Sequence, residues 1–182
     1  MKTPTTTAEI AIQIHKRLLA ADHTLVIAES CTAGRIAATL AEVPGASRVL
    51  AGSAVVYQIP TKVAWLHIPE ATFDDADAVS SPVAHEMATG VLRQTPHASI
   101  ALAITGHLGP NAPEDLDGTA WVAIANGRNG KVVEQQFLLD REAAELSHGM
   151  DSESTRLTRQ AAAVHAALNL LLNTLHPEHT EC

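Results

Sequence analysis

The chain of 182 residues has few aromatic residues and few positive charges. Two Trp, one Tyr and two Phe are too few to build the stacking platforms that bind single-stranded nucleic acids. Twelve Lys and Arg against twenty Asp and Glu leave a formal net charge of −8. This balance argues against a nucleic-acid duplex or an anionic membrane as the main partner, because both attract a basic face. It is compatible with a small anionic ligand, since one site can be positive on an acidic surface.

Cysteine and long apolar runs are scarce as well. Cys31 and Cys182 do not form the pattern of a disulfide framework, and we interpret Cys31 as a small buried residue, with a reactive thiol as the alternative. No apolar run has the length of a membrane span, and the N-terminal residues lack the apolar core of a signal peptide. None of the ten His forms a pair at the spacing of a metal site. We therefore expect a cytoplasmic protein without a metal.

The hydrophobic pattern predicts an α/β fold. Apolar residues at helical spacing and helix-start signals predict helices over about 7–21, 35–41, 82–92 and 152–175. Short apolar runs predict strands near 24–28, 49–57, 98–104, 119–125 and 131–139, the last two joined by a hairpin turn. Strands that alternate with helices favour an α/β architecture. The length fits a single domain over 1–182, with its core at about 8–175 and a frayed tail at 176–182.

The first candidate site is the polar turn Glu29–Gly34, between a predicted strand and a predicted helix. It places Ser30 at the carboxyl end of a strand, where α/β sheets bind their ligands. The backbone N–H groups of such a turn converge on one point, which suits a phosphate or an oxyanion. The alternative is that the hydroxyl residues of the turn only cap the helix.

Two further candidates lie later in the chain. Lys62 follows Tyr57 in an apolar neighbourhood, and a lysine whose pKa is lowered by burial can act as a general base toward a serine. An exposed lysine on a helix is the alternative. Thr105 ends the most apolar predicted strand, and Gly106 permits a close approach of the backbone. An ordinary transition from strand to loop has the same pattern.

Three arginines near the C-terminal end are candidates for holding an anion: Arg141, Arg156 and Arg159. An anionic substrate on an acidic protein needs local cations, and the planar fork of arginine suits a phosphate. Surface pairing with neighbouring glutamates is the alternative.

Taken in order, these residues resemble the C-terminal domain of the CinA family, a nicotinamide-nucleotide amidohydrolase (PncC-like) domain. The resemblance extends from about residue 10 to residue 172. It rests on five segments, which are Ala28–Gly34, Gly52–Tyr57 followed by Lys62, Val79–Ser80, Ile104–Pro110 and Gly118–Val122.

The resemblance implies a single three-layer α/β/α domain with a central mixed sheet, in a homo-oligomer that needs no cofactor. It also implies deamidation of a small-molecule nucleotide, nicotinamide mononucleotide, to nicotinate mononucleotide and ammonia. Ser30 matches the nucleophile and Lys62 the base, while Tyr57 and Thr105 match catalytic residues lining the same pocket. The implied substrate-binding positions are Cys31, Thr32, Ala33, Gly34, Gly106 and a late arginine, with Arg159 preferred over Arg141 and Arg156.

Several segments depart from the family's pattern. The family's turn is Thr-Gly-Gly, whereas this chain has Thr32-Ala33-Gly34, and a positive φ at Ala33 would be strained. Asn111–Pro113 replaces a sequence of Asp-Gly-Gly type, Leu139–Arg141 replaces a Gly-Asp-Arg motif, and 145–153 has the character of an insertion. These departures favour an alternative function, in which a catalytically altered CinA-like domain binds a nucleotide or a protein. The retained Ser30, Tyr57, Lys62 and Thr105 favour the amidohydrolase, which is the leading hypothesis.

Overall fold

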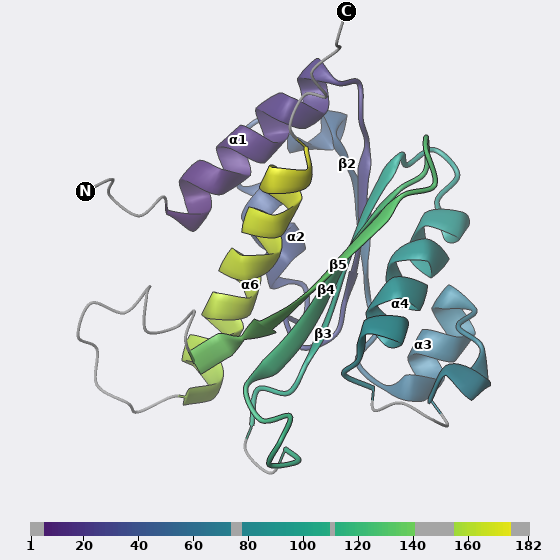
Figure 1. The fold of residues 1–182 in the computed structure, drawn as a ribbon. Coiled ribbons are helices and arrows are strands. Elements are labelled where there is room, and N and C mark those ends of the chain that lie inside the picture. The colour runs from purple at the N-terminus through teal and green to yellow at the C-terminus, as the bar shows by residue number, and fades with distance from the viewer. Residues whose placement is uncertain (1–5, 74–77, 110–111, 141–154, 176–182) are drawn as a thin grey trace, which may run out of the picture.

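The structure is a computed structural model that describes residues 6–73, 78–109, 112–140 and 155–175. These residues build a five-stranded sheet in the order β2-β1-β3-β4-β5 (Figure 1). The strands are β1 (Leu25–Glu29), β2 (Leu50–Val55), β3 (Ile100–Gly106), β4 (Thr119–Asn126) and β5 (Val132–Leu138). The sheet is mixed, because β1 pairs in parallel with β2 and β3, whereas β4 pairs antiparallel with β3 and β5.

Helices cover both faces of the sheet, which confirms the predicted three-layer α/β/α fold (Figure 1). One face packs against α1 (Thr7–Ala20), α2 (Arg35–Ala41) and α6 (Thr155–Thr174). The other face packs against α3 (Ile59–Leu66) and α4 (Ser81–Gln94). Two short 3₁₀ helices, η1 (Ala46–Arg48) and η2 (Glu70–Phe73), lie in the connections.

The two helical layers explain the apolar character of the central strands. Along β1, Leu25 and Ile27 belong to the core beneath α1 and α6, while Val26 and Ala28 pack toward α4. Successive side chains of a strand point to opposite faces, so a strand covered on both faces is apolar at every position. All of β1 is buried, whereas the edge strand β2 is only partly buried. The buried strands β1 and β3 therefore form a rigid base for the loops at their carboxyl ends.

The helices and strands that the hydrophobic pattern predicts are present, with boundaries shifted by a few residues. A capping box between Thr6 and Glu9 starts α1, because each residue satisfies a free N–H group of the other. None of the described helices is long and apolar enough to cross a membrane. The predicted tail at 176–182 and the predicted insertion at 145–153 lie outside the described residues.

Candidate active site

Two neighbouring parallel strands end at the same edge of the sheet and bring the candidate residues together. Strand β1 ends at Glu29, which lies opposite Ile104 near the end of β3. The turn after β1 is tied to β3, because the Ser30 N–H donates to the Ile104 carbonyl at 3.1 Å. Helix α3, which follows β2, supplies Lys62. The site therefore lies at the carboxyl edge of the parallel strands, where α/β sheets bind ligands.

Lys62 is buried against Ser30. The residue is 1% exposed, and its Nζ lies 2.9 Å from the Ser30 Oγ, 2.8 Å from the Val56 carbonyl oxygen and 3.1 Å from the Tyr57 carbonyl oxygen. Burial lowers the pKa of Lys62 to about 8, because the ammonium loses its hydration there. The alternative of an exposed lysine on a helix is wrong. An appreciable fraction of Lys62 is uncharged at mildly alkaline pH.

A pocket of about 240 Å³ opens in front of this pair. The predicted site residues in its lining are Ser30, Cys31, Tyr57, Lys62, Thr105, Gly106 and Arg156. The Thr105 hydroxyl donates to the Ala78 carbonyl at 2.8 Å, so its proton is engaged in the pocket wall. Among the described residues, no group of three or more His, Cys, Asp and Glu is arranged to hold a metal ion.

Cys31 and Gly106 form a tightly packed part of the wall. A Cβ added to Gly106 would lie 3.1 Å from the Cys31 Sγ and 3.0 Å from the Ala120 Cβ, so a side chain at this position would displace the turn. Cys31 is buried, and this burial raises the pKa of its thiol to about 12. The thiol therefore stays protonated, which favours the interpretation as a small buried residue over a reactive cysteine.

Among the described late arginines, Arg156 is the one that reaches the pocket. Its guanidinium donates to the Tyr57 hydroxyl and to the Gly109 carbonyl, each at 2.6 Å. Arg156 and Tyr57 are both exposed, although Tyr57 also lines the pocket. This pair therefore stands at the mouth of the pocket, with Lys62 at its buried end.

Arg159 has a different environment from Arg156. It is 7% exposed, and its guanidinium donates to the Asp117 carboxylate at 2.9 Å and to the Asp140 carboxylate at 2.6 and 2.8 Å. Hydrogen bonding to Arg159 lowers the pKa of Asp140. The preference for Arg159 as the phosphate ligand needs correction, because its N–H groups are already shared between two carboxylates. Arg141 lies outside the described residues.

Glu29 organises the turn, a role that the sequence motifs did not reveal. It is fully buried, and its carboxylate accepts a hydrogen bond from the Thr32 hydroxyl at 2.7 Å. It also accepts from the backbone N–H groups of Gly34, Ile36 and Ala37 at 3.0–3.1 Å. A carboxylate is stabilised at a helix N-terminus, because the helix dipole and its free N–H groups favour negative charge. The sequence feature that could have indicated this role is an acidic residue at the end of a strand, shortly before a helix.

The role of Glu29 corrects two expectations about the turn. Thr32, Ala33 and Gly34 do not line the pocket: the Gly34 N–H binds Glu29, and the Ala33 N–H donates to the Ser30 carbonyl at 3.1 Å. The converging N–H groups thus bind a carboxylate of the protein itself. The alternative of a hydroxyl cap is also wrong, because the N-cap residue of α2 is Gly34 and makes no side-chain hydrogen bond.

A family model for the CinA C-terminal domain matches residues 7–175. The chain belongs to the CinA C-terminal domain family. It is 36% identical over 153 residues to a nicotinamide-nucleotide amidohydrolase PncC from Enterobacter agglomerans, which covers 82% of this chain and 92% of that protein. It is 38% identical over 144 residues to a CinA-like protein from Mycobacterium sp. strain JLS, which covers 79% of this chain. The chain spans only 34% of the length of that second relative.

Solved structures of CinA proteins share this fold. The competence/damage inducible protein CihA from Agrobacterium tumefaciens matches with a TM-score of 0.81 and 28% identity, over 97% of this chain and 99% of that chain. A CinA superfamily protein from Enterobacter cloacae matches with a TM-score of 0.81 and 26% identity, over 96% of this chain and 95% of that chain. These matches confirm the predicted family and fold class.

Within this CinA domain, Ala33 carries the strain that the sequence predicts. Its φ is +52°, in the left-handed region where a side chain costs about 1–2 kcal/mol. We expect Ala33→Gly to raise the free energy of unfolding by about 0.5–1 kcal/mol, because glycine relieves this strain. The control Ala38→Gly, at an exposed position inside α2, should lower it by about 1 kcal/mol. Urea unfolding measures both, and two losses of similar size would contradict the prediction.

Glu29→Gln should destabilise the CinA domain. The amide would direct two N–H groups toward the backbone N–H groups of α2, so we expect the free energy of unfolding to fall by about 2–4 kcal/mol. The control Glu42→Gln lies at the exposed C-terminal end of the same helix and should change stability by less than about 0.5 kcal/mol. Urea unfolding of the two variants checks this difference. If Glu29→Gln and Glu42→Gln had equal free energies of unfolding, Glu29 would not stabilise the turn.

Proposed function

We propose that this CinA C-terminal domain hydrolyses the carboxamide of nicotinamide mononucleotide and releases nicotinate mononucleotide and ammonia. The observation that carries the proposal is the buried contact of 2.9 Å between the Lys62 amine and the Ser30 hydroxyl, inside a pocket. A serine becomes a nucleophile when an adjacent base accepts its proton. The name of the relative from Enterobacter agglomerans, a nicotinamide-nucleotide amidohydrolase, supports this choice of substrate.

The partners of the Lys62 amine match the needs of a general base. An uncharged amine has two N–H groups and one lone pair. The Val56 and Tyr57 carbonyls lie at 2.8 and 3.1 Å and can accept the two N–H groups. The charged ammonium donates to the Ser30 Oγ at 2.9 Å, and in the uncharged amine the lone pair would accept from the Ser30 hydroxyl at this position. Because this pairing satisfies the uncharged form completely, Lys62 is prepared to take the proton of Ser30.

The reaction then proceeds in two halves. The Ser30 Oγ bonds to the carboxamide carbon as its proton moves to Lys62, and Lys62 returns that proton to the leaving nitrogen, which departs as ammonia. A water molecule then attacks the acyl carbon as Lys62 takes its proton. The bond between this carbon and the Ser30 Oγ breaks, Lys62 returns the proton to Oγ, and nicotinate mononucleotide leaves. The N–H group of Cys31, which lines the pocket, would stabilise the oxyanion, because those of Ala33 and Gly34 are already bonded.

The pocket and its mouth would bind different parts of the substrate. The volume of about 240 Å³ lies below the roughly 300–1,000 Å³ typical of pockets for whole drug-sized ligands. The carboxamide ring therefore occupies the pocket, and the ribose phosphate extends toward the mouth. Arg156 stands there as an exposed cation beside Tyr57. Charge-assisted contact with the phosphate would supply affinity that the uncharged amide lacks.

Removing the cation at the mouth should weaken the binding of the phosphate. We expect Arg156→Gln to raise the KM for nicotinamide mononucleotide by about 10- to 100-fold, because a charge-assisted hydrogen bond is lost. The KM for nicotinamide riboside, which has no phosphate, should change little. Steady-state kinetics with both substrates measures the difference, and Arg48→Gln, an exposed arginine of η1, is the matched control. An equal rise for both substrates would contradict a phosphate contact.

An ammonia-release assay tests the proposed function directly. Purified protein is incubated with nicotinamide mononucleotide, nicotinamide riboside or nicotinamide, in the presence of EDTA and without an added cofactor. We expect the mononucleotide to be the preferred substrate. Binding of the mononucleotide without ammonia release would instead favour the binding module. Size-exclusion chromatography with light scattering tests the predicted homo-oligomer.

A further inference from the structure

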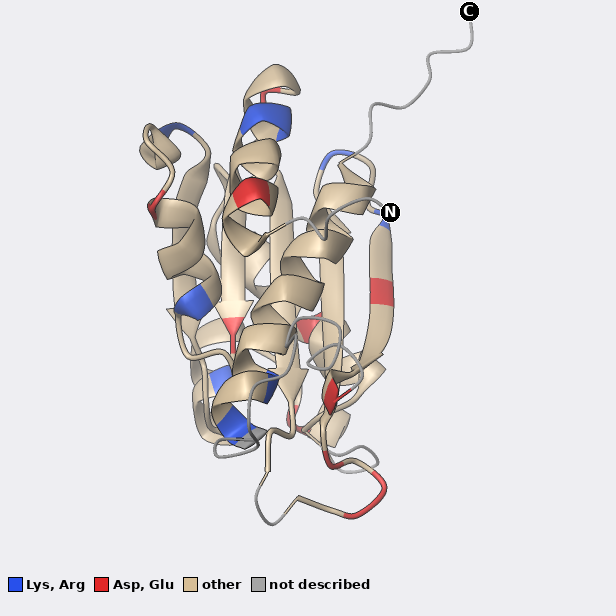
Figure 2. Cartoon of the chain, turned by 90° about the vertical axis from the view of Figure 1, so that its left-hand side faces the viewer, with Lys and Arg blue, Asp and Glu red and all other residues tan. Residues whose placement is uncertain are grey.

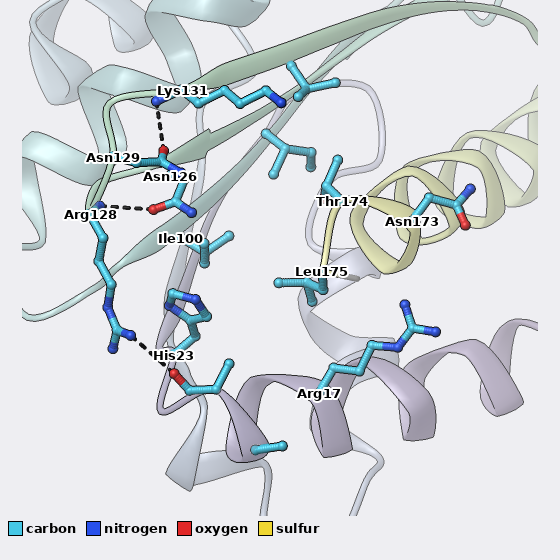
Figure 3. A pocket seen from close by; sticks show the side chains of 14 residues that line it. Arg17, His23, Ile100, Asn126, Arg128, Asn129, Lys131, Asn173, Thr174 and Leu175 are labelled. Atoms are coloured by element: carbon cyan, nitrogen blue, oxygen red, sulfur yellow. Dashed lines mark hydrogen bonds between the residues drawn. The ribbon is translucent and has the colours of Figure 1, made fainter. Parts of the chain in front are cut away.

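A second and larger pocket lies at the opposite end of the sheet from Ser30. It has a volume of about 970 Å³, roughly four times that of the pocket at Lys62. Ile100, at the start of β3, lines it and pairs with Leu25 at the start of β1. The ends of α1 and α6 and the turn between β4 and β5 surround it (Figure 3). Its size lies within the range of sites for small organic ligands.

The charge of this pocket is opposite to that of the protein. Arg17, Arg128 and Lys131 line it, and none of its lining residues is Asp or Glu. The whole chain has a net charge of −8, so a lining with three cations is a local exception, although the Asp22 carboxylate lies 3.8 Å from the Arg128 guanidinium. In Figure 2, segments with Lys or Arg lie at the upper end of the molecule, where this pocket is, and also at its lower end. Local positive potential attracts anions even when the net charge is negative.

Helix capping accounts for two of these cations. Arg17 donates to the Leu172 carbonyl at 2.5 Å near the end of α6. Arg128 donates to the Ala21 carbonyl at 3.1 Å and to the Asp22 carbonyl, just beyond α1. Cations at helix C-termini are favourable there because of the helix dipole. These two arginines therefore have a structural role, and each guanidinium still has further N–H groups to offer.

Capping does not account for Lys131. Among the described residues, no carboxylate pairs with its ammonium, and its backbone N–H donates to the Asn129 side chain at 2.9 Å. Figure 3 shows its side chain reaching across one side of the pocket, while Arg17 lies on the other. Burial is the main cause that lowers the pKa of His23, another lining residue; the Arg128 charge adds to this shift and the Asp22 charge opposes it.

The floor of the pocket is apolar and its rim offers amides. Side chains of the sheet and of the end of α6 form the floor, which contains Ile100, Ile124, Val133 and Leu175. Three asparagines also line the pocket, namely Asn126, Asn129 and Asn173. The side-chain oxygens of Asn126 and Asn129 accept backbone N–H groups of the turn, so their amide N–H groups are the ones left to donate to a ligand. An apolar floor with a few polar groups is the usual composition of a small-molecule site.

We propose that this pocket binds a small organic anion, a phosphate, sulfonate or carboxylate attached to an apolar ring system. The ring would pack on the apolar lining at Ile100, Ile124 and Val133, and the anionic group would contact Lys131. The pocket is separate from the Ser30–Lys62 pair, so the proposal does not depend on the hydrolase activity.

Fluorescence titration with 8-anilinonaphthalene-1-sulfonate tests the site, since this probe joins a sulfonate to apolar rings. We expect Lys131→Gln to raise the Kd of the probe by about five- to tenfold, because one charge contact is lost. The matched control Lys16→Gln removes an exposed lysine of α1 that does not line the pocket, and its Kd should equal that of the unchanged protein. The uncharged analogue N-phenyl-1-naphthylamine should bind both variants equally.

Three outcomes would overturn the proposal. Equal affinities of Lys131→Gln and Lys16→Gln for the sulfonate would show that Lys131 does not contact the anion. A loss of probe binding in Arg156→Gln alone would place the probe in the pocket at Ser30. Equal weakening of the charged and uncharged probes by Lys131→Gln would show a structural effect of the substitution. Because Lys131 is exposed, its replacement should leave the fold intact.

Discussion

Ser30→Ala should lower ammonia release from nicotinamide mononucleotide by about 10³-fold or more, because no other group can replace the attacking oxygen. The fold should persist, since the change removes one oxygen whose described partner is the Lys62 amine at 2.9 Å. Circular dichroism and urea unfolding check the fold, and the ammonia assay checks turnover. The matched control Ser47→Ala lies on the surface in η1 and should keep full activity.

The Ser30 variant also separates binding from chemistry. Because the substitution leaves the proposed phosphate contact at Arg156 and the proposed ring pocket in place, nicotinamide mononucleotide should bind Ser30→Ala with nearly unchanged affinity in calorimetry. Retention of near-normal ammonia release in this variant would remove Ser30 from the mechanism. The pocket would then need a different nucleophile, such as an activated water.

Lys62→Met should lower kcat by about 10²- to 10⁴-fold, the range expected when a general base is lost. Methionine fills a similar volume without an ionisable group, so the fold and the binding of the mononucleotide should remain. Lys62→Arg should not restore activity, because the guanidinium stays protonated. The control Lys16→Met, at an exposed position of α1, should have normal kinetics.

The pH profile gives an independent measure of Lys62. Burial lowers its pKa to about 8, so the ammonium predominates below that pH and cannot accept the proton of Ser30. The value of kcat/KM should therefore rise with pH, pass its midpoint near pH 8 and become constant above it. A profile that falls over this range, or one that stays flat, would contradict a base at Lys62.

Much of the fold follows from local patterns in the chain. The continuous apolar run at 24–28 predicts β1 because a strand covered on both faces must be apolar throughout. The turn at 126–130 between two apolar runs predicts the antiparallel pairing of β4 with β5. These features depend on neighbours within a few residues, so hydrophobic periodicity encodes them. The strain at Ala33 is predictable in the same way, from one residue in one turn.

The candidate site depended on contacts between distant parts of the chain. Sequence motifs selected Ser30 and Lys62, but only the folded structure shows the Lys62 amine buried 2.9 Å from the Ser30 hydroxyl, across 32 positions of sequence. Periodicity does not encode desolvation, which determines whether a lysine is a base or a surface charge.

The sequence by itself determined the α/β elements, the family and the pair of residues to examine. Only the tertiary structure decided which charged groups are free to act. It placed Arg159 between two carboxylates and Arg156 at the mouth of the pocket, although both are arginines of the same helix. It also assigned the N–H groups of the turn to Glu29. The physical reason is that the availability of a charge depends on its partners and its hydration, which the folded chain sets across long distances in sequence.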